Sequence, residues 1–214
     1  MLVSASFLSS KDIPKFLTKL NDTDINYIHV DVMDGAYVKN KTMPFREMKH
    51  ISDYTSKRLD VHLMVKNPLK YIDDYASLNT EYITIHKDID DNLLKCLKEI
   101  KSYYIKAGIA LKNEDEIKDI IPYLPYIDLI LVMSVTPGAG GQAFQEEAVD
   151  KLKELKILKN EYKGKFSFII NVDGGINNNT IAKVKDYTDM VVSGSYLADS
   201  NNLQDNCYFT VIKK

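Results

Sequence analysis

Histidine and aspartate recur inside stretches of this chain that are otherwise apolar. His29 and Asp31 lie in the segment HVDVMDG, His62 follows Asp60 in DVHLMV, and Asp173 ends the apolar part of NVDGG. An unpaired buried carboxylate is costly, so such residues need a hydrogen-bonded partner or a cation. Two imidazoles and two carboxylates suit a borderline divalent metal such as zinc. We therefore predict a metal site at His29, Asp31, His62 and Asp173.

The three stretches have the aliphatic and β-branched composition that is typical of buried β-strands. Side chains alternate between the two faces of a strand, so His29 and Asp31 share one face, as do Asp60 and His62. A single strand histidine is more often a hydrogen-bonded core residue than a ligand. The recurrence of the pattern on a third stretch, with Asp173, favours the metal site.

Strand-like and helix-like segments alternate along the whole chain, which predicts an α/β fold of the (β/α)8 TIM-barrel type, in one domain over residues 1–214. A doubly wound open sheet has the same alternation, but it gathers its site at one switch point, whereas polar residues here follow many strands. The predicted strands are 2–8, 27–33, 58–65, 82–86, 105–111, 127–134, 166–172 and 190–192. After the third of them we predict a helix over 69–78, with Asn67 as its cap and Pro68 at its first position.

Composition is ordinary for a soluble globular protein, with 45% hydrophobic and 27% charged residues and a formal net charge of −2. Basic and acidic residues are interspersed, so we expect no nucleic-acid partner. The longest apolar run, 127–135, is too short to span a bilayer and no signal-like segment is present, so we expect no membrane association and a cytoplasmic protein. Cys96 fits a buried helix face, and neither it nor Cys207 has a plausible disulfide partner.

These motifs, with LVMSVTPGAGGQ from Leu131 and SFLS from Ser6, resemble ribulose-phosphate 3-epimerase over nearly the whole chain. The resemblance implies a TIM barrel of the ribulose-phosphate-binding type and an isomerase of the pentose phosphate pathway. Its expected reaction is metal-dependent epimerisation at C3 of a ketose phosphate, most simply D-ribulose 5-phosphate to and from D-xylulose 5-phosphate. We expect one divalent ion, with zinc first and iron, manganese or cobalt as alternatives. Whether the chain is a homo-oligomer stays open.

Inverting a carbon next to a ketone requires removing its proton and replacing it from the other side, and Asp31 and Asp173 fit these acid/base roles. A metal beside them would stabilise the enediolate and keep both carboxylates ionised. Backbone N–H groups after the last two strands are expected to hold the phosphate. The resemblance implies substrate-binding roles for Ser6, His62, Met33, Met64, Met133, Gly138, Gly140, Gly141, Gly174, Gly175, Gly194 and Ser195. His86 is left undecided between a site residue and a structural histidine.

The chain departs from the family pattern in loops that would cover the substrate. Lys39 replaces a proline, Ala139 replaces an aromatic residue, and Lys112 replaces an asparagine. These changes leave two alternatives open: a 3-epimerase of a hexulose 6-phosphate such as allulose 6-phosphate, and a non-catalytic phosphosugar-binding barrel. Decarboxylation is disfavoured, because the strands lack the Asp-x-Lys-x-x-Asp motif of related decarboxylating barrels.

Overall fold

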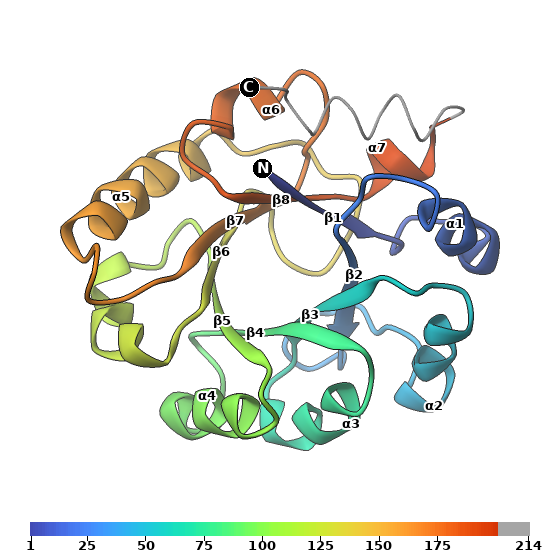
Figure 1. The fold of residues 1–214 in the computed structure, drawn as a ribbon, viewed down its shortest axis with the longest axis horizontal. Helices are drawn as coiled ribbons and strands as arrows, with labels where there is room; N and C mark the ends of the chain where they lie inside the picture. Colours follow the sequence, from blue (N-terminus) through green and yellow to red (C-terminus); the bar gives the residue numbers. More distant parts are fainter. Residues whose placement is uncertain (201–214) are drawn as a thin grey trace.

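Eight parallel strands close into a barrel in the computed structural model, which describes residues 1–200. The strands follow one another around the sheet in chain order, and the last pairs with the first (Figure 1). This closure confirms the predicted (β/α)8 TIM barrel and excludes the open sheet. The strands are β1 (Leu2–Ser6), β2 (Tyr27–Met33), β3 (Arg58–Met64), β4 (Thr80–His86), β5 (Lys106–Leu111), β6 (Leu129–Met133), β7 (Ile169–Asp173) and β8 (Met190–Ser193).

Helical segments follow the strands and surround the ring of strands (Figure 1). None of the helices within residues 1–200 has the length and apolar character needed to cross a membrane. The α-helices are α1 (Ile13–Leu20), α2 (Phe45–Met48), α3 (Ile72–Ala76), α4 (Leu93–Ser102), α5 (Glu147–Glu161), α6 (Ile181–Val184) and α7 (Ser195–Ala198). The 3-10 helices are η1 (Lys49–Asp53), η2 (Pro68–Lys70) and η3 (Ile117–Tyr126).

The main hydrophobic core joins one face of the strands to the buried faces of the helices, as with Val30 and Leu17. The strands are buried on both faces, which is usual for parallel sheets covered by helices. Several polar side chains are nevertheless almost fully buried, among them His29, Asp60 and Asn171. They lie on strand positions that alternate with the core residues, so the second strand face points into the barrel. This interior is mixed, because a smaller apolar cluster that includes Leu131, Met133 and Met190 lies there as well.

Asn67 stands at the N-cap position before Pro68, as predicted, but the continuous helix predicted over 69–78 is wrong. Asn67 makes no side-chain capping bond, and the segment divides into η2 and α3, with Tyr71 between them. Asp91, from the loop after β4, accepts a 3.0 Å bond from the backbone N–H of Leu69 instead. Pro68 does stand at the first position of η2, as predicted. A carboxylate distant in sequence therefore takes the place of the local cap.

The predicted strand ends differ from the observed ones by up to three residues. β1 ends at Ser6 instead of residue 8, because the chain turns there with a 2.9 Å bond from Ser10 N to Phe7 O. β7 begins at Ile169 instead of residue 166 and includes Asp173. Both shifts keep the predicted inward faces of the strands.

Cys96 lies on the buried face of α4 beside Leu97 and Ile100, as the sequence predicts. Burial raises the pKa of its thiol to about 11, so the thiol stays protonated at neutral pH. Cys207 lies outside the described residues.

Candidate active site

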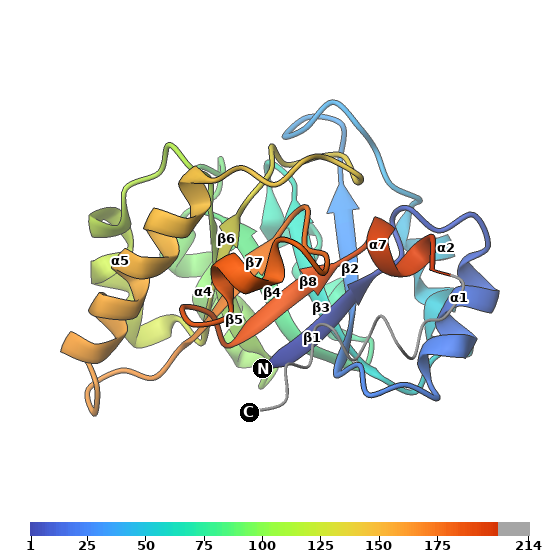
Figure 2. The same ribbon diagram turned by 90° about the horizontal axis from the view of Figure 1, so that it is seen from above.

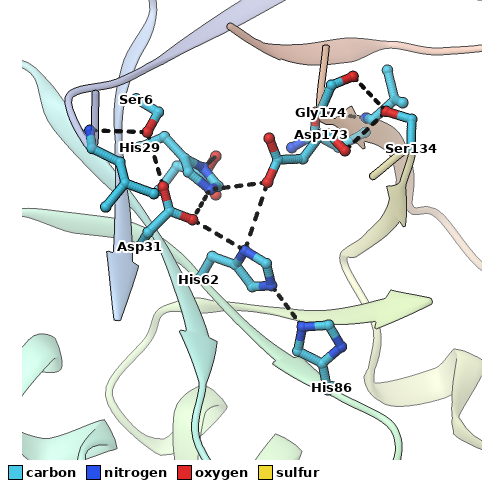
Figure 3. A network of polar contacts seen from close by, with 12 residues as sticks. Ser6, His29, Asp31, His62, His86, Ser134, Asp173 and Gly174 are labelled. Atoms are coloured by element: carbon cyan, nitrogen blue, oxygen red, sulfur yellow. Dashed lines mark hydrogen bonds and ion pairs between the residues drawn. The ribbon is translucent and has the colours of Figure 1, made fainter. Parts of the chain in front are cut away.

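The strand register brings the predicted metal ligands together. In the β2–β3 pair, His29 lies opposite Asp60 and Asp31 lies opposite His62, and all of these side chains are buried. Asp173 comes from β7, which is separated from β2 by β8 and β1 around the barrel. One ligand atom from each of His29, Asp31, His62 and Asp173 lies within 4.8 Å of the others (Figure 3).

The distances among these atoms fit a single cation. Oδ1 of Asp31 lies 3.4 Å from Nε2 of His29 and 3.5 Å from Nδ1 of His62, and both nitrogens lie 3.8 Å from Oδ2 of Asp173. Four tetrahedral ligands about 2.1 Å from an ion lie about 3.4 Å from one another. The two nitrogens are buried and make no hydrogen bond within residues 1–200. The donor set and its spacing therefore fit a divalent ion.

Asp60 orients the first of these histidines. Nδ1 of His29 donates a 2.8 Å hydrogen bond to Oδ2 of Asp60, and both side chains are almost completely buried. With its hydrogen on Nδ1, the ring has its Nε2 lone pair free to face the cluster. The sequence placed Asp60 on the same strand face as His62 but gave it no role. This shared face was the signal in the sequence that Asp60 could belong to the site. Only the register of β2 and β3 shows that Asp60 pairs with His29.

We expect Asp60→Ala to weaken metal binding by roughly 10- to 100-fold, the usual effect of losing a carboxylate behind a ligating histidine. The measurement is a competition titration of zinc against a chromophoric chelator. Asp53→Ala is the matched control, because Asp53 is exposed, pairs with His50 in η1 and is not part of the cluster. Equal zinc affinities for Asp60→Ala and the native protein would contradict this role.

The charges of the cluster push the pKa values of its two carboxylates in opposite directions. Burial raises the pKa of Asp31, but His29 and, to a smaller extent, His62 together more than offset this effect and hold the pKa below its usual value. Burial raises the pKa of Asp173 to about 6, although His29 opposes this rise. For His29, burial lowers the pKa, but Asp31 and Asp60 raise it well above the usual value. The carboxylates thus favour a positive charge at this point, which a divalent cation also supplies.

Two serines position the aspartates of the cluster, one through a carboxylate and the other through the backbone. Oγ of Ser6 donates a 2.8 Å bond to Oδ2 of Asp31, which leaves Oδ1 facing the histidines. Oγ of Ser134, at the end of β6, lies 2.9 Å from the carbonyl oxygen of Asp173 and 2.7 Å from that of Gly174. Ser134 was not predicted from the sequence as a site residue. It fixes the backbone that carries Asp173 (Figure 3).

A cavity opens above the cluster. Asp31 and Asp173 line it, whereas His29 and His62 lie buried behind them. Gly174 has a φ of +121°, and a Cβ there would lie 2.5 Å from the side chain of Val135, so this wall requires glycine. The remaining predicted substrate-binding residues that line the cavity are Ser6, Met33, Met64, Met133, Gly138, Gly140, Gly141, Gly174, Gly175, Gly194 and Ser195.

The loops after β2 and β6 lie at the barrel end toward which the strands point (Figure 2). Nδ2 of Asn40 donates a 2.7 Å bond to the carbonyl oxygen of Gly138, which ties one loop to the other. Gly138 also packs on Val38, and a Cβ at this glycine would lie 2.9 Å from the Val38 Cβ. Lys39 and Ala139, where the chain departs from the family pattern, are next to these contacts and also line a second, outer cavity.

His86, which the sequence left undecided, contacts the cluster directly. It ends β4, is completely buried, and has its Nε2 2.9 Å from Nε2 of His62 (Figure 3). It therefore lies behind a ligand and does not line the cavity. Burial, together with the His62 imidazole, lowers the pKa of His86 well below its usual value, so its ring is neutral. His50 is exposed in η1 and has no part in the cluster.

Solved structures with the same fold include two enzymes of low sequence identity. A tryptophan synthase structure from Mycobacterium tuberculosis matches with a TM-score of 0.69 and 14% identity, covering 98% of this chain and 91% of the other. A 3-hexulose-6-phosphate synthase from Salmonella typhimurium matches with a TM-score of 0.65 and 16% identity, covering 98% and 96%. At these identities the likeness establishes the barrel fold alone.

Curated proteins are much more similar in sequence. A ribulose-phosphate 3-epimerase of Helicobacter pylori (strain J99 / ATCC 700824) is 36% identical, over 94% of this chain and 90% of its own length. That of Bacillus subtilis (strain 168) is 33% identical over 91% of each chain. The model of the ribulose-phosphate 3 epimerase family matches residues 2–198. With this match over nearly its whole length, and with the predicted barrel and cluster in place, the chain belongs to the ribulose-phosphate 3-epimerase family.

Proposed function

We propose that this protein is an isomerase that interconverts D-ribulose 5-phosphate and D-xylulose 5-phosphate by inverting C3. Family membership supports the reaction class. The observation that carries the proposal for this chain is the pair of carboxylates, Asp31 and Asp173, which reach one cavity from separate strands. Inversion needs a proton acceptor on one face of C3 and a proton donor on the other, and this pair can supply both.

In the proposed reaction one carboxylate removes the C3 proton, giving an enediolate, and the other returns a proton to the opposite face. The two carboxylates come from separate strands and both line the cavity, so each can exchange a proton with the substrate. Ser6 holds the carboxylate of Asp31 in position, and Ser134 holds the backbone that carries Asp173. Met33, Met64 and Met133 form an apolar wall of the cavity that limits the access of water.

The residues that would hold the divalent ion are His29, Asp31, His62 and Asp173. When bound, such an ion supplies positive charge that stabilises the enediolate oxygens. We propose zinc, because two imidazoles and two carboxylates at this spacing suit it, and iron, manganese and cobalt suit the same donors.

The cavity wall also has the features of a phosphate site. Gly174 and Gly175 follow β7, and Gly194 and Ser195 follow β8, the positions at which barrels of this kind hold phosphate through backbone N–H groups. The loop with Gly138, Gly140 and Gly141 would then cover the sugar.

The substrate is tested by comparing kcat/KM for D-ribulose 5-phosphate and D-allulose 6-phosphate with zinc at saturation. We expect the pentulose phosphate to be the better substrate, since the Gly140-Gly141 and Gly174-Gly175 pairs resemble the pentulose enzymes. A higher kcat/KM for the hexulose would assign the protein to that substrate. Binding of either sugar without turnover would identify a non-catalytic barrel.

Restoring an aromatic residue to the loop after β6 is expected to tighten substrate binding. Ala139 borders both cavities, and an aromatic ring there adds apolar surface that closes over the sugar. We predict that Ala139→Phe lowers KM more than it changes kcat, if loop closure contributes equally to ground-state and transition-state binding. Steady-state kinetics with saturating metal measure this, and an unchanged or higher KM would show that the substitution is neutral or compensated elsewhere.

A further inference from the structure

The two ring nitrogens of His62 face different partners. Nδ1 points toward Asp31 and Asp173, whereas Nε2 lies 2.9 Å from Nε2 of His86 (Figure 3). A hydrogen bond between two neutral imidazole nitrogens needs the hydrogen on one of them and a lone pair on the other. This contact therefore couples the tautomer of His62 to that of His86.

Only one of the two arrangements leaves His62 able to bind an ion. If Nε2 of His62 donates to His86, the lone pair of His62 is on Nδ1 and faces the cluster. If His86 donates instead, Nδ1 of His62 carries a hydrogen and cannot act as a ligand. In the first arrangement His86 has its own hydrogen on Nδ1, a buried atom without a hydrogen bond among residues 1–200.

The surroundings of His86 hold its ring in place. The ring of Tyr37, from the loop after β2, lies 4.8 Å from it at an angle of 35°. The Tyr37 hydroxyl donates a 2.6 Å bond to Asp88, which also accepts a 2.8 Å bond from Nζ of Lys112. His86 therefore has a metal-binding histidine on one side and an anchored aromatic ring against its face. Lys112 is one of the positions where this chain departs from the family pattern.

We propose that His86 is a positioning residue that selects the tautomer of His62 able to bind the ion, with the Tyr37–Asp88–Lys112 contacts holding His86 in place. This inference rests on the proposed metal site. It assigns His86 no contact with the substrate, because His86 is completely buried and does not line the cavity. The predicted consequence is a change in metal affinity and coordination.

The test compares two substitutions at this position in the full-length protein. The Gln side chain in His86→Gln has an oxygen that can accept the hydrogen bond from His62, whereas that in His86→Leu has no acceptor. Zinc and cobalt affinities are measured by chelator competition, and the visible absorption of bound cobalt reports its coordination. We expect His86→Leu to lose roughly 10- to 100-fold in affinity with an altered cobalt spectrum, as for other residues that orient a ligand. His86→Gln should stay within about threefold of the native protein on the same scale.

His50→Leu is the control, because it removes an exposed histidine that is not part of the cluster and should change neither readout. Native affinity and spectrum in His86→Leu would overturn the proposal, as would equal losses in His86→Leu and His86→Gln, because a purely structural role does not depend on an acceptor. If His86→Leu does not fold, His86→Met replaces it in the same comparison. Failure of the native protein itself to bind zinc or cobalt would instead refute the metal site, so the two failures are distinguishable.

Discussion

Asp31→Asn and Asp173→Asn are each expected to lower kcat for epimerisation by roughly 10²- to 10⁴-fold, the usual cost of losing a general acid or base. Asparagine keeps the shape of the side chain and one oxygen that can still face the cluster, but it cannot take up or deliver a proton. Among the described residues, Asp31 and Asp173 are the carboxylates that line the cavity. No other carboxylate there can therefore take over the role of the one that is replaced. The variants should differ in one respect, because each removes the acid/base group on only one face of C3.

The measurement is kcat with the metal content of each variant verified, since the same residues are proposed ligands. Exchange of the C3 proton with solvent is followed separately from inversion, because one remaining carboxylate can still exchange the proton on its own face. Asp53→Asn, an exposed carboxylate outside the site, should retain native turnover. Near-native kcat in either variant with metal bound would show that the acid/base assignment is wrong.

Metal removal is expected to abolish turnover and to destabilise the fold. Without a cation, the carboxylates of Asp31 and Asp173 lose a compensating charge, and the enediolate loses its electrostatic stabilisation. Binding to the native state alone stabilises a protein by about 2.7 kcal/mol when the free ligand is at 100 times its Kd. Tm should therefore rise with free zinc concentration.

Chelator-treated protein is assayed before and after adding back zinc, with Tm followed in parallel. His62→Ala, which removes one of the proposed ligands, should show neither the recovery nor the rise in Tm at the same zinc concentration. Full turnover in a sample shown to contain no metal would refute the metal requirement.

The sequence was sufficient to predict the barrel and the residues of the cluster, because both depend on strand alternation. His29, Asp31, His62 and Asp173 face inward for the same reason that the intervening aliphatic residues face outward. The four side chains come together because the sheet closes into a barrel. The family resemblance supplied the glycines and methionines, which indeed line one cavity.

The contacts that the sequence did not predict are made between residues from different segments of the chain. Asp60 meets His29 because of the β2–β3 register, which strand periodicity does not reveal. His86 meets His62 for a related reason, since adjacent strands set which inward side chains touch. Asp91 displaces the expected Asn67 cap through a contact between two loops. In each case the partner is distant in the chain.

Because Ala139 replaces an aromatic residue and Lys39 a proline, we predict that the loops after β2 and β6 close less tightly over the substrate. The structure does show that the loops after β2 and β6 contact each other through Asn40, Val38 and Gly138. The residues that make these contacts are not Ala139 and Lys39, the positions at which the family has an aromatic residue and a proline. The kinetics of Ala139→Phe are thus a direct measure of what the lost aromatic contributes.

Epimerisation of D-ribulose 5-phosphate in deuterated water tests the central claim most directly. Zinc-loaded protein is incubated with the substrate, and NMR spectroscopy follows both the formation of D-xylulose 5-phosphate and the appearance of deuterium at C3. Two-base transfer by Asp31 and Asp173 predicts a product that carries solvent deuterium at C3 from the first turnovers, because the incoming proton comes from a carboxylate that exchanges with water. Product that forms without deuterium at C3, or the absence of any product with metal bound, would contradict the account.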